Sequence, residues 1–270
     1  MQNILSVSGL DYGNVRNVSF ELPRSGSLGL FGENDSGRSA VVRLVLGMIR
    51  RLGGEISIAE NTSVGAVVAG AGFPGSMTLS QIGRMLGMIH DSWDGGKYSA
   101  LLAEMELGEK VKAGALNTDG QMRLAFCAAM ARRTDLLVVD CPPDCPSWVG
   151  GRVMSYLKET GGSVLLSARS AADVACCDRA GLMYAGSLLF CDSVRTLKEM
   201  YRVITLDEKE MQTVNRRKLI GARRTASGTK ALVRREDFKE NRFNLSEPTL
   251  AQIAGCFVRR EEARNARFGL

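Results

Sequence analysis

Residues 27–54 read SLGLFGENDSGRSAVVRLVLGMIRRLGG, and this segment gives the strongest indication of the fold. An apolar run at 27–31 predicts a buried strand, and a loop bounded by glycines, GENDSGRS at 32–39, follows it. Apolar residues at helical spacing then occupy 40–52, and the glycine pair at 53–54 predicts the end of that helix. A strand, a glycine-bounded loop and a helix in this order are typical of a phosphate-binding junction, because backbone N–H groups at a helix N-terminus attract anions.

The loop matches the phosphate-loop pattern G-x-x-x-x-G-K-[ST] everywhere except at the lysine. Gly32, Gly37 and Ser39 have the required spacing, and Arg38 stands where the pattern has lysine. Arginine keeps the positive charge, but its guanidinium is a larger, planar group than an ammonium. The pattern favours a phosphate site, and an ordinary strand–turn–helix junction is the alternative.

Strands and helices alternate along the first 200 residues. Strands are expected at 3–8, 15–22, 54–58, 64–68, 136–140 and 163–168. Helices are expected at about 78–107, 119–133, 148–160 and 172–180, with a hairpin at 182–190. The run LLVVD at 136–140 is continuously apolar up to its aspartate, as in a strand buried in a parallel sheet. This alternation predicts an α/β fold with a mostly parallel sheet and helices on its faces.

The positive charge of the chain is concentrated near its C-terminal end. The formal net charge is +6, and residues 201–270 alone hold 16 Lys and Arg against 9 Asp and Glu. A basic segment can contact nucleic acid or anionic lipid, but acidic and apolar residues are interspersed here, as in RREDFKENRF at 234–243. We therefore expect a solvated basic region and no nucleic-acid partner.

Neither a zinc site nor a membrane span is expected. Seven cysteines include no C-x-x-C pair, and the single histidine, His90, leaves too few ligands at zinc spacing. The cysteines, among them the neighbours Cys176 and Cys177, are expected to be reduced and mostly buried. The N-terminal residues lack the features of a secretory signal, and no apolar run approaches the roughly 20 residues that cross a bilayer. The sequence thus predicts a cytoplasmic protein.

Residues 28–58 resemble the Walker A region of ABC ATPases, and the resemblance continues in register along almost the whole chain. DYGNVRNVSFEL at 11–22 resembles the first hairpin of that family, and LLVVDCPPD at 136–144 resembles its Walker B strand. Residues 163–190 resemble the switch strand and the closing strands. EPTLAQIAGCFVRREEA at 247–263 resembles the tail of bacterial ATP-binding subunits that serve multidrug or lantibiotic-type exporters.

This resemblance implies a particular architecture. Residues 1–200 would form a P-loop NTPase-type ABC ATPase domain, with a mostly parallel sheet, helices on both faces and an antiparallel β subdomain. A helical subdomain would cover about 75–130, and residues 201–270 would form a basic C-terminal accessory region.

The resemblance also implies ATP with Mg²⁺ as the ligand. Tyr12 stands where an aromatic side chain stacks on adenine. The positions implied to bind the nucleotide phosphates are Gly32, Asn34, Gly37, Arg38, Ser39 and Ala40. Ser39 and Asp140 stand at the two Mg²⁺ positions.

The positions that perform hydrolysis in the family are substituted here. Cys141 follows Asp140 where the family has a glutamate that polarises water, and a thiol cannot replace that carboxylate as a general base. Arg169 stands at the switch histidine, and Ala69 at the glutamine of the loop after 64–68. No residue is therefore assigned a catalytic role.

The signature and the segment after Walker B are also altered. LNTDG at 116–120 stands at the spacing of LSGGQ, and a shift of one residue gives NTDGQ. In either register Asp119 would bring a negative charge toward the γ-phosphate bound by a partner cassette. Ser147 stands where the family has an aspartate that communicates across the dimer.

The function implied is that of a degenerate ATP-binding subunit, a pseudo-ATPase that pairs with a membrane permease. It would form a homodimer, or a heterodimer with another ABC cassette, at the inner face of the cell membrane. Two alternatives remain at this stage: a weakly active ATPase subunit that energises export, and a soluble ABC-type regulatory protein.

Overall fold

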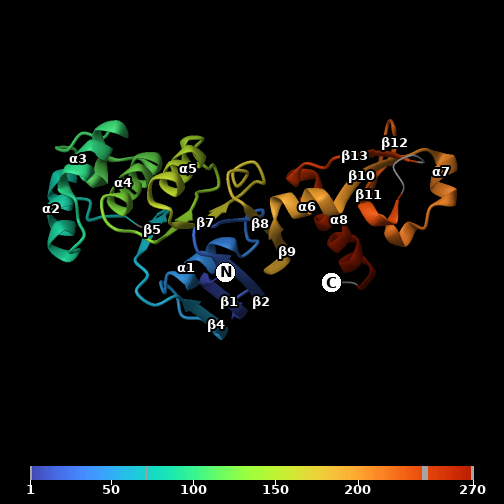
Figure 1. Ribbon diagram of the computed structural model, residues 1–270, viewed down its shortest axis with the longest axis horizontal. Coiled ribbons are helices and arrows are strands. Elements are labelled where there is room, and N and C mark those ends of the chain that lie inside the picture. The colour runs from blue at the N-terminus through green and yellow to red at the C-terminus, as the bar shows by residue number, and fades with distance from the viewer. Residues whose placement is uncertain (1, 71, 239–242, 269–270) are drawn as a thin grey trace.

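A computed structural model describes residues 2–70, 72–238 and 243–268 of the chain. The molecule is elongated, with helices α2 and α3 at one end, a central sheet in the middle and the strands β10–β13 at the other end (Figure 1). Within the described residues, no helix combines the length and the hydropathy that a membrane crossing requires.

The central sheet has six strands in the order β5-β6-β7-β3-β8-β9. These are β3 (Ser27–Phe31), β5 (Val64–Val68), β6 (Leu136–Asp140), β7 (Ser163–Ala168), β8 (Arg179–Tyr184) and β9 (Ser187–Ser193). All neighbours pair in parallel except β8 and β9, which form the predicted antiparallel hairpin. Every residue of β3, β6 and β7 is buried, because both faces of the sheet are covered.

An antiparallel sheet and one helix cover the first face. The sheet has the order β2-β1-β4 and consists of β1 (Asn3–Tyr12), β2 (Val15–Pro23) and β4 (Gly53–Ile58). Helix α1 (Arg38–Val45) buries Val41, Val42 and Leu44 in a core shared with β1, β2 and the central sheet. The predicted antiparallel β subdomain is thereby confirmed.

Four helices lie on the opposite side, where α4 and α5 cover the sheet and α2 and α3 pack against α4. They are α2 (Leu79–Ile89), α3 (Gly95–Glu104), α4 (Thr118–Met130) and α5 (Trp148–Thr160). Their buried side chains share one apolar cluster with Phe31, Val139 and Leu166 of the sheet. Thr78 begins α2 with a capping box that includes Gln81, and Asp94 caps α3 by accepting from the Lys97 N–H. The single helical stretch predicted at 78–107 is therefore two helices.

Two further helix predictions were wrong. The helix predicted at 40–52 ends at Val45, because Gly47 takes the left-handed conformation (φ 68°) and the Met48 N–H bonds back to the Arg43 carbonyl. The helix predicted at 172–180 consists of turns and bends up to Asp178, and its last two residues begin β8. Its end is fixed by Asp178, whose carboxylate accepts from the Ser27 N–H and hydroxyl at the start of β3.

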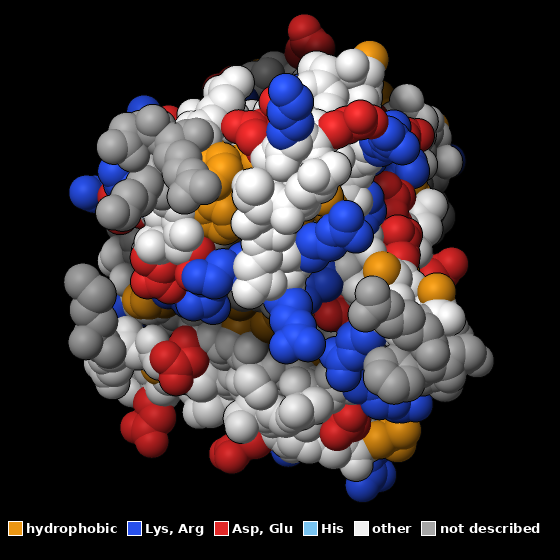
Figure 2. All heavy atoms as spheres, turned by 90° about the vertical axis from the view of Figure 1, so that its right-hand side faces the viewer, with side chains coloured by type: hydrophobic (Ala, Val, Ile, Leu, Met, Phe, Trp, Pro, Cys, Tyr) orange, Lys and Arg blue, Asp and Glu red, His pale blue; other side chains and the backbone are white. Residues whose placement is uncertain are grey.

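The C-terminal residues form a sheet and a long helix. Helix α6 (Val194–Met200) leads into a four-stranded antiparallel sheet of order β11-β12-β10-β13. The strands are β10 (Tyr201–Leu206), β11 (Ile220–Thr225), β12 (Gly228–Arg234) and β13 (Asn244–Ser246). The helices of this region are α7 (Glu208–Thr213) and the long C-terminal α8 (Leu250–Phe268). Short 3-10 turns lie at Arg216–Lys218 and Arg235–Asp237. Figure 2 shows that Lys and Arg side chains at this end stand among Asp and Glu side chains. The division of the chain at residue 200 stays a prediction.

Candidate nucleotide-binding site

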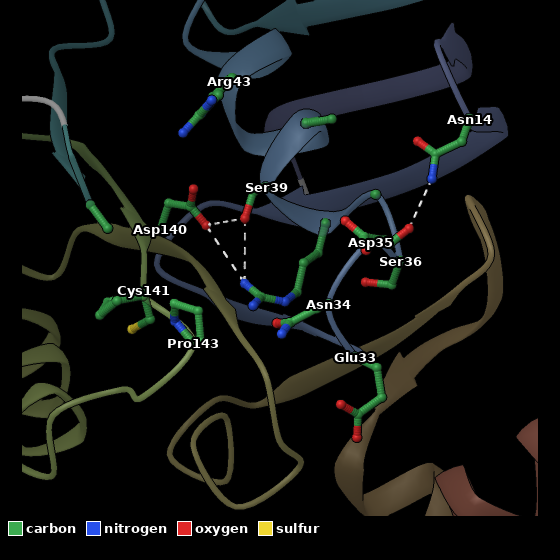
Figure 3. A pocket seen from close by; sticks show the side chains of 15 residues that line it. Asn14, Glu33, Asn34, Asp35, Ser36, Ser39, Arg43, Asp140, Cys141 and Pro143 are labelled. Carbon is green, nitrogen blue, oxygen red and sulfur yellow. Dashed lines mark hydrogen bonds and ion pairs between the residues drawn. The ribbon is translucent and has the colours of Figure 1, made fainter.

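A pocket of about 460 Å³ lies where β3, β5 and β6 end and α1 begins (Figure 3). Residues 33–39 of the glycine-bounded loop form one wall, which we call the loop wall, together with Ala40 and Arg43 of α1. Ala69 after β5, Asp140 at the end of β6 and residues 141–143 after it form the facing wall. Parallel strands bring their carboxyl ends to one edge of a sheet, and ligands of α/β proteins bind in the crevice outside that edge.

Most of the predicted site residues line this pocket. Asn34, Gly37, Arg38, Ser39, Ala40 and Asp140 contribute to the lining, as do Ala69 and Cys141. Tyr12 and Gly32 are not among the lining residues. Tyr12 is half-buried and packs against the core around α1, so its predicted stacking on adenine stays untested.

Two lining residues outside the predicted phosphate loop and Walker B segment were missed by the sequence reasoning. Asn14, in the turn between β1 and β2, donates from Nδ2 to the Asp35 carbonyl at 2.8 Å and so holds the loop. No local pattern connects positions 21 residues apart, so the contact left no signal in the sequence. Arg43 lies one helical turn after Ser39 on α1. This i, i+4 spacing places both side chains on one face of the helix and could have predicted Arg43 from the sequence.

The backbone of the loop has the shape that an anion site needs. Asp35 and Gly37 adopt left-handed conformations (φ 63° and 93°), and Gly37 caps α1 without a side chain. A Cβ at Gly32 would lie 2.2 Å from the Met183 carbonyl oxygen, so only glycine fits there. The Ser36 hydroxyl is buried in the loop and has no hydrogen-bond partner among the described residues. Buried polar groups are normally paired, so this hydroxyl is an exception inside the loop.

Arg38 is buried, at 5% exposed, and folds back into the base of the pocket. Its Nε donates to the Gly32 carbonyl at 3.1 Å, and its Nη1 donates to the Ser167 hydroxyl at 3.2 Å. The same Nη1 lies 3.8 Å from Oδ1 of Asp140, which is 3% exposed. The guanidinium therefore balances a buried carboxylate that would otherwise be costly to desolvate.

Asp140 has two further partners, both hydroxyls. Ser39 Oγ and Ser167 Oγ each donate to Asp140 Oδ1 at 2.9 Å. The Ser39–Asp140 pair joins the start of α1 to the end of β6 and is the pair predicted to bind Mg²⁺. No group of three or more His, Cys, Asp or Glu side chains in the described parts of the chain is arranged to hold a metal ion.

On the facing wall, a buried thiol follows Asp140. Cys141 is 3% exposed, and its sulfur lies 2.6 Å from the sulfur of Cys145. The hydrogen bond with Cys145, together with burial, raises the pKa of the Cys141 thiol well above its ordinary value. Arg169 donates from Nε to the Glu33 carboxylate at 3.0 Å, so the cation at the switch position is paired with the loop itself.

In the segment predicted to correspond to the signature, the charge of Asp119 is balanced within the chain. Asn117 caps α4 by accepting from the Gly120 N–H at 2.8 Å. The Asp119 carboxylate accepts from Arg123 Nε at 2.8 Å and from Trp148 Nε1 at 2.7 Å. Arg123 also lies over the Trp148 ring, 5.7 Å from its centroid. The predicted effect of Asp119 on a partner cassette stays untested, but its charge has a counter-ion in this chain.

Sequence comparison finds relatives among export ATPases, although no family model matches the chain. The O-antigen export system ATP-binding protein RfbE of Yersinia enterocolitica is 30% identical over 142 residues, which cover 51% of this chain and 57% of that protein. The teichoic acids export ATP-binding protein TagH of Lactiplantibacillus plantarum is 23% identical over 240 residues, 80% of this chain and 62% of that protein. The chain thus spans less than two thirds of the length of either relative.

Structure comparison gives the same fold. An ATP-binding subunit of an ABC transporter superposes with a TM-score of 0.63 at 18% identity, covering 72% of this chain and 92% of that one. A dimeric bacterial ABC transporter cassette superposes with a TM-score of 0.60 at 15% identity, covering 70% and 98%. The predicted resemblance is thereby confirmed: the chain has the ABC ATPase cassette fold, and its sequence relatives are ATP-binding subunits of ABC transporters.

Proposed function

We propose that the chain is the nucleotide-binding subunit of an ABC export complex, and that its own site binds ATP but hydrolyses it slowly or not at all. One observation carries the proposal: an anion-binding loop faces a wall in which a buried thiol, Cys141, stands at the position that should activate water. The relatives named above serve O-antigen and teichoic acid export, which supports an export role.

The loop wall supports phosphate binding. The N-terminus of α1 opens into the pocket, and its uncapped N–H groups carry partial positive charge. The Arg43 guanidinium adds a positive charge to the lining of the pocket. These groups fit a polyphosphate without requiring lysine at position 38.

The residues fit a magnesium ion poorly. Ser39 and Asp140 offer oxygen ligands, which Mg²⁺ prefers in near-octahedral geometry. The Arg38 guanidinium, however, already lies 3.8 Å from the same Asp140 oxygen and is held there by Gly32 and Ser167. Because a fixed cation occupies the neighbourhood of the carboxylate, we expect nucleotide binding to depend only weakly on Mg²⁺.

The facing wall supports slow hydrolysis. A thiol does not accept a proton from water as a carboxylate does, so Cys141 leaves the attacking water unpolarised. Ala69 presents only a methyl group, and Arg169 is paired with Glu33. The residues at positions 69, 141 and 169 would therefore slow the attack of water on the nucleotide without weakening the binding of its phosphates by the loop wall.

We further propose pairing with a permease and with a second cassette, which would place the chain at the inner face of the membrane. Met88 and Ile89 at the end of α2 are 83% and 63% exposed, and such exposed apolar side chains favour a protein contact. A soluble regulatory protein of the same fold would purify without a permease, so co-purification distinguishes the two.

The test is calorimetric titration of ATP into the chain, with Mg²⁺ and with a chelator, followed by phosphate release from the same sample. We expect binding in both buffers and little release. No binding in either buffer would overturn the nucleotide-binding proposal, whereas rapid release with binding would favour the active ATPase.

A further inference from the structure

The two cysteines on the facing wall form a close pair. Cys141 and Cys145 are separated by Pro142, Pro143 and Asp144, and their sulfur atoms lie 2.6 Å apart. The Cys141 N–H donates to the Ser167 carbonyl at 2.8 Å, which fixes the first cysteine against β7. The pair is thus held by the fold at a distance from which a sulfur–sulfur bond can form with little movement.

The two thiols face different hollows. Cys141 is almost completely buried and lines the nucleotide pocket. Cys145 is half-buried and lines a second hollow of about 880 Å³, whose walls include Arg169 and residues of α8. A reagent in solution therefore reaches Cys145 first, and Cys141 can be reached through Cys145.

We propose that Cys141 and Cys145 are a modification site, a dithiol that small-molecule disulfides convert reversibly into an intrachain disulfide in the wall of the nucleotide pocket. The Cys145 thiolate attacks one sulfur of the small disulfide, breaks its S–S bond and releases one thiol. Cys141 loses its proton to solvent, and its sulfur attacks the Cys145 sulfur of the mixed disulfide and releases the second thiol. The protein loses two hydrogens, and the small disulfide gains two as it becomes two thiols.

A second pair of thiols, Cys176 and Cys177, competes for the oxidant and supplies a control variant. Cys176 and Cys177 are adjacent in sequence, and the hydrogen bond from Cys177 lowers the pKa of Cys176 to about 7. Cys176 is half-buried and more acidic than an ordinary thiol, so it competes for the same oxidant. Its sulfur partner, Cys177, is the next residue in the chain, and we expect Cys176 to stop at a mixed disulfide.

The experiment uses the full chain in a series of oxidised-to-reduced glutathione ratios, trapped with an alkylating agent and digested by a protease that cleaves before aspartate. Cleavage before Asp144 separates Cys141 from Cys145, so a disulfide between them joins two peptides. We expect the joined peptides to appear as the ratio rises and to separate on reduction. Cys145→Ser should abolish the joined species, and the matched control Cys176→Ser should retain it.

Three results would overturn the proposal: no joined peptides at any ratio, a glutathione adduct that persists on Cys145, or oxidation of Cys141 in the Cys145→Ser variant. If that variant fails to fold, the order of alkylation in the native wild-type chain decides the matter. Cys145 must be alkylated before Cys141, and the reverse order contradicts the proposal. None of these readouts involves nucleotide, so they are independent of the proposed function.

Discussion

The two walls of the nucleotide pocket depend on different parts of the chain. The loop wall relies on backbone: left-handed residues at 35 and 37, a glycine that nothing else can replace at 32, and the N-terminus of α1. The facing wall relies on side chains, and Ala69 and Cys141 cannot perform the reactions of an amide or a carboxylate. Anion binding survives side-chain substitution because N–H groups are present whatever the residue, whereas water activation depends on a single functional group.

The largest effect is expected on the free energy of unfolding when Arg38, whose guanidinium joins the two walls, is replaced. Arg38→Ala leaves Asp140 buried with only hydroxyl partners, and breaking a buried pair in this way costs about 3–5 kcal/mol of unfolding free energy. Denaturant unfolding measures this loss. Arg195, exposed in an i, i+4 pair with Glu199, is the matched control, and its replacement by alanine should leave the midpoint unchanged. Equal losses of stability in the two variants would contradict the role of Arg38 in stabilising the buried Asp140 carboxylate.

The second prediction tests whether the loop wall acts through its backbone. Gly37→Ala strains a residue at φ 93°, and its Cβ would meet Val15, so we expect ATP affinity to fall by about 100-fold, or about 2.7 kcal/mol. Gly47→Ala is the matched control, because Gly47 is also left-handed at φ 68° but lies at the far end of α1 with open space around it. Calorimetry on both variants decides the point, and similar affinities would refute a backbone origin of binding.

A smaller effect is expected from restoring chemistry to the facing wall. Cys141→Glu supplies a carboxylate in the pocket, and we expect phosphate release to rise by about tenfold, below the 10²–10⁴-fold that a well-placed general base contributes. The gain is limited because Ala69 and Arg169 are still altered. Cys141→Ser, which adds no base, should show no rise. If phosphate release rose equally in both variants, loss of the thiol and not gain of the carboxylate would be the cause, which contradicts the prediction.

The smallest effect is expected at the exposed ion pair between Arg169 and Glu33, beside the nucleotide pocket. Arg169→Ala removes a bond to Glu33 in which the two side chains are 44% and 78% exposed, so stability should change by less than about 1 kcal/mol. ATP affinity should also fall slightly, because Glu33 would then stand uncompensated in the loop. Thermal unfolding and calorimetry on this variant and on Glu33→Gln would test this. A large loss of stability would reveal that the pair is structural.

Local patterns predicted those parts of the fold that local forces determine. The buried strands around 27–31, 136–140 and 163–168 lie where their apolar runs placed them, and α5 begins and ends as predicted. The phosphate loop was likewise visible, because its chemistry is contained in eight consecutive residues, 32–39.

Contacts between distant residues account for what the sequence could not show. The helical pattern at 172–180 gives way to turns because Asp178 is bound to Ser27, 151 positions away. The salt bridge between Arg169 and Glu33 joins segments 136 positions apart. The C-terminal sheet was missed because its strands are short and mixed in polarity, and they pair only through tertiary contacts.

The Ser36 hydroxyl has a cost in stability for the loop that contains it. An unsatisfied buried polar group costs about 1–3 kcal/mol, and this one lies in the segment that leads into α1. A ligand that binds only the folded chain would raise the free energy of unfolding. If the pocket binds nucleotide as we propose, the stability of the chain would therefore report occupancy without any turnover.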